Sequence, residues 1–366
     1  MIYLDYSATT KCDKDILDTY NKVTEEYFAN SSSLYSLGYQ VKELIDTATN
    51  NIADLFSVKP NEIIYTSSAT EANNMAIKGI IFYKNRDKKI ITSSKIHSSI
   101  KETLKYMSTL GYDIYVLKND STGRIDLEDL KNNIESSCLV TIPLVSSEVG
   151  ILEDIEKIKE IVKSNSRCFL HIDATQAVGK ISFNMNDIDM LSLSAHKLFG
   201  IKNSGLLIKK EKVNLIPLIH GGMSTTIYRS GTADQASIAC MAKTLRKSLE
   251  NIDEKYEYVK NLKEDLINFF LKIIVFVIFI LFVGLILASI HLILHSFLES
   301  DYAGIGTAVI FFLFMKKIFN AAEKKSLSIV ENVSFWITKL FCSMEEKKYN
   351  KINSVLYEEL NPKKYI

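Results

Sequence analysis

The sequence lacks any pair of cysteines at the spacing of a metal site or a redox motif. Its five cysteines are odd in number, far apart in the chain and never in a C-x-x-C pair. They are Cys12, Cys138, Cys168, Cys240 and Cys342. This pattern argues against a disulfide framework and a zinc site, and it favours a reducing compartment. The first residues also lack a basic segment followed by an apolar one, so we expect no secretory signal there.

An excess of charge of one sign is also absent. The chain holds 44 Lys and Arg against 43 Asp and Glu, a formal net charge of +1. Such a balance gives no argument for a nucleic acid partner, and we expect none. The length of 366 residues allows one large domain and something smaller, because single hydrophobic cores stop growing near about 250–300 residues.

The first two thirds of the sequence alternate short apolar runs with amphipathic helical stretches. Apolar residues recur at helical spacing over residues 38–57, and a short β-type run follows at 62–66. We expect further helices from about 69, at 97–110 and at 154–163, and further strands at 89–92, 113–117, 138–144, 168–172 and 190–194. This order predicts an α/β domain with a largely parallel sheet, whose functional sites lie beyond the carboxyl ends of the strands.

One lysine follows the last of these strands. Residues 189–200 read DMLSLSAHKLFG, which is an apolar run followed by Ser194, His196 and Lys197 and then a glycine. At the end of a buried strand, desolvation and neighbouring cations would lower the pKa of a lysine and make its amine nucleophilic. Taken alone, such a lysine is more simply a solvated residue at a strand end. The segment HIDATQAVGK at 171–180 favours a functional role instead.

These two segments resemble the pyridoxal phosphate (PLP) signature of the class V aminotransferase family, and within it the cysteine desulfurases. Five further segments match in the same order: YLDYSATT at 3–10, NSSSLYSLG at 30–38, TSSATEANN at 66–74, HGG at 220–222 and RSGT at 229–232. The match covers roughly the first 250 residues and then stops. The resemblance implies a PLP-dependent transferase large domain of fold type I over residues 1–260, a small amino-acid substrate and a homodimer.

By this resemblance, four residues would act on the reactive part of the cofactor. Lys197 would hold it, His97 would stack over its ring and assist proton transfers, and Gln176 would hydrogen-bond its phenolic oxygen. Asp173 follows an apolar strand, so its carboxylate should be partly buried and in need of a cation. A protonated pyridine nitrogen supplies one, and the protonated ring serves as an electron sink. Taken alone, His97 would be a surface histidine at the start of a helix.

A second group of residues would hold the cofactor phosphate. Ser68 and Glu71 have capping-box spacing, which would start a helix directly after a strand. Free N–H groups and the dipole at a helix start hold a phosphate, although an ordinary helix cap has the same pattern. The resemblance assigns phosphate contacts to Thr70, Ser194, His196 and, from a second subunit, Thr232. The family usually has glycine at the position of Ser68 and asparagines at Ser146 and Ser147, where Ser147 can still donate a hydrogen bond to the cofactor over a shorter reach.

A long uncharged run follows the region of resemblance. Residues 273–294 contain no charged residue and are long enough to cross the roughly 30 Å of membrane hydrocarbon as a helix. With a shorter apolar run at 302–319, they predict a transmembrane region over 268–320 and a lysine-rich helical tail over 321–366. Lysines flank both runs and the connection has none, so we expect the PLP domain and the tail to be cytoplasmic. A core helix is the alternative for the first run, and a single span is the alternative for the region.

Two parts of the family's C-terminal domain are not recognisable in this chain. The resemblance implies a loop cysteine that attacks the substrate sulfur and an arginine that binds the substrate carboxylate. The last arginine is Arg246, and Cys342 lacks the small, glycine-rich neighbours of that loop. The leading hypothesis is a desulfurase with weak or absent activity, which converts L-cysteine to L-alanine and passes a persulfide to an acceptor protein. The alternatives are a degenerate PLP-binding, membrane-tethered scaffold or partner, and a frame-joined product of a truncated gene.

Overall fold

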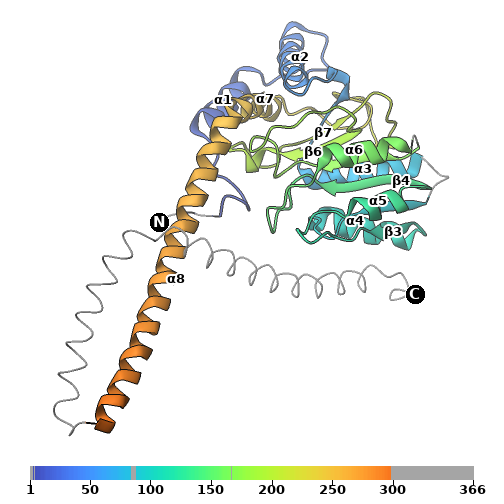
Figure 1. Cartoon of the computed structure of the whole chain (residues 1–366). Helices are drawn as coiled ribbons and strands as arrows, with labels where there is room; N and C mark the ends of the chain where they lie inside the picture. Colours follow the sequence, from blue (N-terminus) through green and yellow to red (C-terminus); the bar gives the residue numbers. More distant parts are fainter. Residues whose placement is uncertain (1–2, 4, 84–87, 166, 298–366) are drawn as a thin grey trace. The chain divides into compact units, whose positions relative to one another are not determined.

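The computed structural model describes residues 3, 5–83, 88–165 and 167–297, with side chains up to residue 292 (Figure 1). Within these residues the chain divides into two compact units between Tyr256 and Glu257. Each unit is described by itself.

The first unit is built on one seven-stranded sheet with the strand order β1-β7-β6-β5-β4-β2-β3. The strands are β1 (Ile63–Thr66), β2 (Lys89–Thr92), β3 (Asp113–Val116), β4 (Ser137–Pro143), β5 (Phe169–Asp173), β6 (Met190–Ser194) and β7 (Gly205–Lys209). Strand β7 pairs antiparallel with β1 and β6, and the other neighbours pair in parallel. The prediction of an α/β fold with a largely parallel sheet is confirmed. The alternation of helices and strands did not predict β7, which follows β6 without an intervening α-helix.

Helices cover both faces of this sheet (Figure 1). They are α1 (Lys14–Glu26), α2 (Ser36–Phe56), α3 (Ala69–Tyr83), α4 (Ser98–Thr109), α5 (Leu127–Asn133), α6 (Ile155–Ser164) and α7 (Gln235–Leu249). One hydrophobic core includes α3, α4 and Ile64, and the other includes α2, α6, α7 and Ile63. Adjacent residues of β1 thus face different cores, as the alternation of side chains along a strand requires. Every residue of β4 is buried, because a central parallel strand is covered on both faces.

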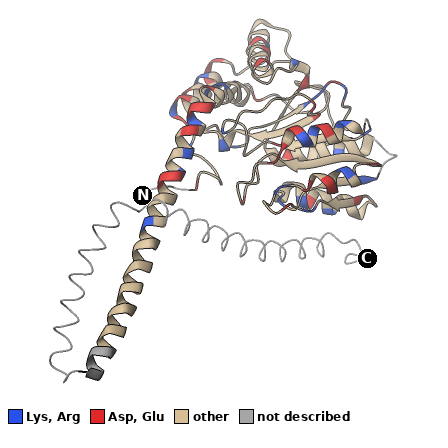
Figure 2. Cartoon of the chain, in the orientation of Figure 1, with Lys and Arg blue, Asp and Glu red and all other residues tan. Residues whose placement is uncertain are grey.

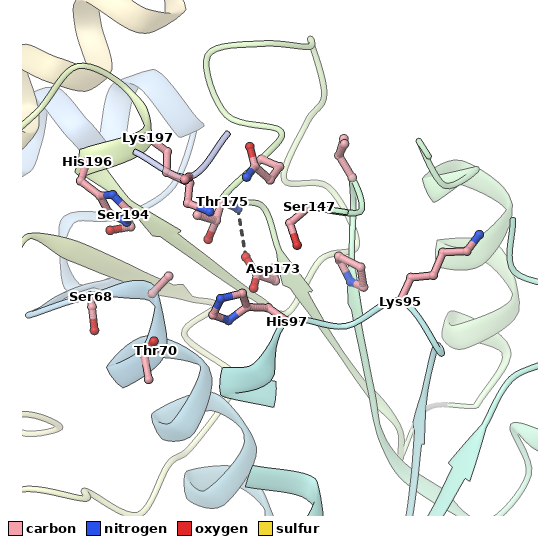
Figure 3. Close-up of a pocket in the computed structure, with 15 residues that line it drawn as sticks. Ser68, Thr70, Lys95, His97, Ser147, Asp173, Thr175, Ser194, His196 and Lys197 are labelled. Carbon is pink, nitrogen blue, oxygen red and sulfur yellow. Dashed lines mark hydrogen bonds between the residues drawn. The ribbon is translucent and has the colours of Figure 1, made fainter. Parts of the chain in front are cut away.

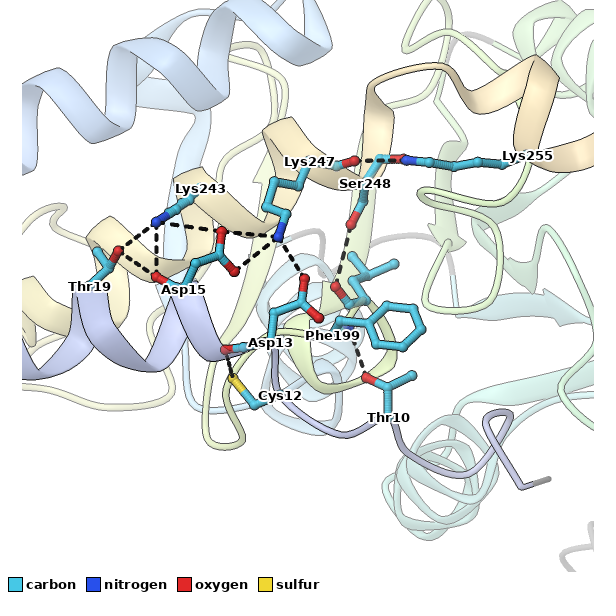
Figure 4. A network of polar contacts seen from close by, with 11 residues as sticks. Thr10, Cys12, Asp13, Asp15, Thr19, Phe199, Lys243, Lys247, Ser248 and Lys255 are labelled. Atoms are coloured by element: carbon cyan, nitrogen blue, oxygen red, sulfur yellow. Dashed lines mark hydrogen bonds and ion pairs between the residues drawn. The ribbon is translucent and has the colours of Figure 1, made fainter. Parts of the chain in front are cut away.

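The N-terminal segment is tied to α7 and to the turn after β6 (Figure 4). Lys247 of α7 donates hydrogen bonds to Asp13 at 2.7 Å and to Asp15 at 3.0 Å, and the bond from Lys247 lowers the pKa of Asp15. Thr10 Oγ1 accepts a hydrogen bond from the N–H of Phe199 at 2.8 Å. The segment that carries the YLDYSATT motif is therefore held against the end of β6.

Helix α8 (Ile252–Phe297) begins at the end of the first unit and forms the described part of the second. Charged residues occur along its first turns up to Lys272 and then stop (Figure 2). Beyond that point the side chains of Phe276, Leu281 and Leu285 are 62%, 63% and 69% exposed. Among the helices of the described residues, this one is long and apolar enough to cross a membrane, judged by length and composition.

Three predicted features lie outside the described residues. They are the second span at 302–319, the tail at 321–366 and Cys342. The helical hairpin and the positions of its ends therefore stay predictions.

Candidate active site

A pocket opens where β4, β5 and β6 end (Figure 3). Its lining residues are Ala8, Ser68, Ala69, Thr70, Lys95, His97, Pro143, Val145, Ser147, Asp173, Thr175, Gln176, Ser194, His196 and Lys197. Eight of the nine predicted site residues line this pocket. The ninth, Thr232, lines a different cavity together with Arg229 and Asp234. The fold thus brings together segments that are far apart in the sequence.

Lys197 lies in a short 3-10 helix, Ala195–Lys197, directly after β6. Burial lowers the pKa of the partly buried Lys197, and the charge of Asp173 offsets this in part. An amine with a lowered pKa is more often unprotonated and nucleophilic at neutral pH. A neighbouring cation acts most clearly on Lys180, where burial and the charge of Lys197 lower the pKa to about 8.

Asp173, the last residue of β5, carries a buried carboxylate that is 7% exposed. Its Oδ1 accepts a hydrogen bond from the N–H of Thr175 at 3.0 Å (Figure 3). Its Oδ2 accepts one from Nδ2 of Asn73 at 2.9 Å. Neither donor carries a charge, so these bonds orient the carboxylate without neutralising it. The site is therefore suited to a ligand that brings its own positive charge.

The N-terminus of α3 forms another wall of the pocket. One bond of the predicted capping box is present there, and the reciprocal bond goes to Ser67 in place of Ser68. The N–H of Glu71 donates to Ser68 Oγ at 3.2 Å, and the N–H of Ser67 donates to Glu71 Oε2 at 2.7 Å. Burial would raise the pKa of Glu71, but hydrogen bonds from Arg229 and Ser67 hold it below its ordinary value. Ser68 is not among the described residues with a positive φ, so a serine at this position does not strain the backbone.

Gly205, the first residue of β7, lies directly behind this helix start. A Cβ added at Gly205 would come within 2.5 Å of the carbonyl carbon of Ser68 and 2.8 Å of its Cα. These are backbone atoms, so only glycine allows the approach without a shift of α3. Sequence reasoning missed Gly205, because the contact joins the start of β7 to the residue before α3, which are far apart in the chain.

Ser194 and His196 approach the pocket from the end of β6. Nδ1 of His196 lies 3.1 Å from Thr9 Oγ1. Burial, and then the charges of Lys197 and Lys202, lower the pKa of His196. Both effects favour the neutral ring, and with Nδ1 engaged by Thr9 its Nε2 is left for a ligand.

Comparison with known proteins agrees with this arrangement. The family model described as aminotransferase class-V matches residues 2–271. The chain is 39% identical over 276 residues to cysteine desulfurase IscS of Buchnera aphidicola subsp. Schizaphis graminum, which covers 73% of this chain and 68% of that protein. The chain belongs to the class V aminotransferase family.

Solved structures show the same relationship. A NifS-like protein is similar with a TM-score of 0.71 and 32% identity, covering 73% of this chain and 74% of that one. A structure titled SspA in complex with cysteine is similar with a TM-score of 0.65 and 31% identity, covering 71% and 78%. The resemblance to cysteine desulfurases is confirmed, and these relatives belong to a PLP-dependent family.

The pocket of this class V family member has groups that suit each part of PLP. The amine of Lys197 suits the aldehyde, and the buried carboxylate of Asp173 suits a protonated ring nitrogen. The N-terminus of α3, with the hydroxyl of Thr70, suits the phosphate. The residues present therefore fit this cofactor.

His97 both caps α4 and lines the pocket. The N–H of Ser99 donates to His97 Nδ1 at 3.1 Å. A backbone N–H can only donate, so Nδ1 of the neutral ring is unprotonated and the proton is on Nε2. His97 is therefore a helix cap that also lines the pocket, and its role toward the cofactor stays a prediction.

Gln176 is held by two partners. Its Nε2 donates to the backbone oxygen of Ser7 at 3.0 Å, and its Oε1 accepts a hydrogen bond from Lys180 Nζ at 2.6 Å. These bonds set which end of the amide is the donor. Lys180 belongs to the motif at 171–180, but nothing in its local sequence pattern shows its burial near Lys197.

We expect the stability of the first unit to depend on Lys180 above about pH 8. Folding holds the pKa of Lys180 at about 8 against an ordinary value of 10.5, so the unfolded chain binds more protons between these values. The wild-type chain should therefore gain stability relative to Lys180→Met as pH rises through this range, by up to about 3 kcal/mol. Thermal melts of both chains, followed by circular dichroism across this range, measure the difference. A difference that stays constant with pH would contradict it.

Proposed function

We propose that this chain binds PLP through Lys197 and acts as a slow cysteine desulfurase on L-cysteine. The observation that carries the proposal is the meeting of the Lys197 amine, the Asp173 carboxylate and the α3 N-terminus in one pocket. The IscS relative is named a cysteine desulfurase, and the structure of SspA is titled as a complex with cysteine. Both names support L-cysteine as the substrate.

The chemistry at the ring would be divided among three residues. Bound PLP supplies a sink for the electron pair that proton removal leaves at the substrate α-carbon. Asp173 would hold the protonated ring nitrogen, because its two protein donors, Asn73 and Thr175, are uncharged and leave its negative charge uncompensated. Lys197 Nζ would hold the cofactor through its aldehyde, and the same amine would serve as a base for the substrate α-proton. His97 carries a proton on Nε2, which it can donate on the pocket side.

The remaining predicted residues would position the cofactor. Phosphate contacts come from Thr70, Ser194 and His196, and ring contacts come from Gln176 and Ser147. The location of Thr232 in a separate cavity supports its assignment to the site of a second copy. We therefore include a homodimer in the proposal.

The proposed low rate of sulfur transfer follows from the positions of the cysteines. Four of them, Cys12, Cys138, Cys168 and Cys240, are in the described residues, and none lines the pocket. Burial raises the pKa of Cys240 to about 12 and also raises that of Cys12, so neither is a ready thiolate. Without a placed thiol, sulfur transfer from the substrate is slow.

We expect sulfide release from L-cysteine below about 1 per second, a rate at the lower end of typical enzymes. The full chain, purified in detergent with PLP, is assayed for sulfide and alanine in the presence of a reductant. Faster turnover would contradict the inference that no thiol is placed to accept the sulfur. Single Cys→Ser variants would then identify the acceptor. Loss of turnover in Cys342→Ser alone would make Cys342 that acceptor. PLP binding with no turnover would instead support the degenerate, membrane-tethered partner.

We also infer that α8 anchors the protein in a membrane. Its apolar side chains are exposed beyond Lys272, and a water-exposed surface of this kind is costly, whereas lipid accommodates it. Lysines precede the uncharged run and follow the second one, and the connection at 295–301 has neither lysine nor arginine. This distribution favours a hairpin with the PLP domain and the tail in the cytoplasm.

The proposed topology predicts which positions can be labelled in intact cells. Ser300→Cys should react with a membrane-impermeant thiol reagent from outside, while the parent chain should not. A tag placed after Ile366 should be protected until the membrane is opened, because both ends are on the cytoplasmic side. Exposure of that tag in intact cells would leave a single span in place of the hairpin.

A further inference from the structure

Four polar residues form one hydrogen-bond chain next to the pocket: Asp173, Asn73, Ser99 and His97. Nδ2 of Asn73 donates to Asp173 Oδ2 and to Ser99 Oγ, both at 2.9 Å. Ser99 Oγ lies 2.9 Å from His97 Nδ1. Asn73 is 0% exposed and Ser99 is 8% exposed, so water does not compete for these bonds. These hydrogen bonds join β5, α3 and the start of α4.

The partners determine the direction of each bond in this chain. A carboxylate can only accept, so the Asn73 amide must present an N–H to Asp173. The second N–H of the amide goes to Ser99 Oγ, which leaves the Ser99 hydroxyl proton for His97 Nδ1. Nδ1 already accepts the backbone N–H of Ser99. Every donor in the chain thus supports a proton on His97 Nε2, the other ring nitrogen.

The asparagine is not explained by stability alone. Oδ1 of Asn73 is buried without a hydrogen-bond partner among the residues that the structure describes, and such an orphaned acceptor costs stability. An apolar side chain of similar size would avoid that cost. What the amide provides instead is a pair of N–H groups, one aimed at Asp173 of the pocket and the other at Ser99 on α4.

We propose that Asn73 and Ser99 are positioning residues that link His97 to Asp173. Asn73 orients the carboxylate for the ring nitrogen of PLP, and Ser99 orients the imidazole so that its proton is on Nε2. The consequence for PLP rests on the proposed function. The bonds themselves are properties of this chain without cofactor.

Three variants of the full-length protein, purified in detergent, test the Asp173 end and the His97 end of the hydrogen-bond chain separately. Asn73→Leu breaks both bonds of the amide, and Ser99→Ala breaks only those to the Ser99 hydroxyl. Thr103→Val is the matched control, because the Thr103 hydroxyl is buried on α4 and donates to the backbone oxygen of Ser99 at 2.8 Å. The PLP dissociation constant reports on Asp173. The ¹⁵N resonances of the His97 ring, measured without cofactor, report on the tautomer.

The expected pattern differs for each variant. Asn73→Leu should weaken PLP binding about tenfold or more, since it removes a hydrogen bond to a charged group, and it should also shift the His97 Nδ1 resonance. Ser99→Ala should shift that resonance and leave the PLP dissociation constant within about twofold. Thr103→Val should change neither.

Two results would overturn the proposal. One is an equal loss of PLP binding in all three variants, which indicates general loosening between α3 and α4. The other is an unchanged His97 resonance in both Asn73→Leu and Ser99→Ala. Circular dichroism checks folding, and Asn73→Ala replaces Asn73→Leu if the leucine is not accommodated. A wild type that binds no PLP would reject the proposed function, whereas the resonances would still decide whether the link exists.

Discussion

Replacing Lys197 with alanine is expected to remove all covalently held PLP from the protein. The pocket places this amine at the end of β6, where burial lowers its pKa and leaves more of the nucleophilic form. Alanine has no group that can bond to the cofactor aldehyde. The wild-type chain incubated with PLP and dialysed should absorb in the visible range, and Lys197→Ala should not. Borohydride reduction and mass spectrometry of peptides should place the cofactor on Lys197.

Lys202→Ala is the matched control for this experiment. Lys202 is exposed and lies five residues further along the chain, outside the pocket lining, so its loss should leave the visible absorbance unchanged. A colourless wild type that takes up no PLP would reject the proposed function. Cofactor retained covalently in Lys197→Ala would indicate attachment to another amine, and Lys180 is the candidate because its pKa is also lowered.

Gly205→Ala is expected to destabilise the first unit and weaken PLP binding together. The added Cβ would come within 2.5 Å of the Ser68 carbonyl carbon, so β7 and the start of α3 must move apart. Overpacking of this kind costs about 1–3 kcal/mol, and for a unit of this size about 2–4 °C of melting temperature for each kcal/mol. The displaced α3 N-terminus is also the proposed phosphate site. Thermal melts and PLP titrations of the full chain measure both effects.

Gly222→Ala provides a control with the same chemical change. A Cβ at Gly222 meets no atom within 4 Å, so the stability should stay within about 0.5 kcal/mol. A Gly205→Ala chain that melts with the wild type and binds PLP equally well would show that β7 and α3 can separate without cost.

Most strands of the sheet were predictable from local pattern, for a physical reason. A strand such as β4 is covered by helices on both faces, so its residues form a mostly apolar run that can be seen without knowledge of its neighbours. Strand β7 is equally buried, but it follows β6 through an irregular connection and pairs antiparallel. The rule of alternating helices and strands therefore gave no reason to expect it.

The location of the pocket was also predictable, because parallel strands that end at one edge of a sheet bring their following residues together. Asp173 at the end of β5 and Lys197 after β6 therefore line the same pocket, as the motifs indicate. Thr232 differs, since it follows no strand of this edge and lies in another cavity.

Residue type and order were sufficient to predict the strands, the uncharged run and the chemistry available at the strand ends, because hydrophobic periodicity and side-chain groups are local properties. Contacts between elements were decided only by the tertiary structure. The approach of Gly205 to Ser68, the amide of Asn73 between Asp173 and Ser99, and the lowered pKa of Lys180 beside Lys197 each depend on two segments packing against one another. Burial and distance in the folded chain set these properties, and neither is contained in the residues on either side.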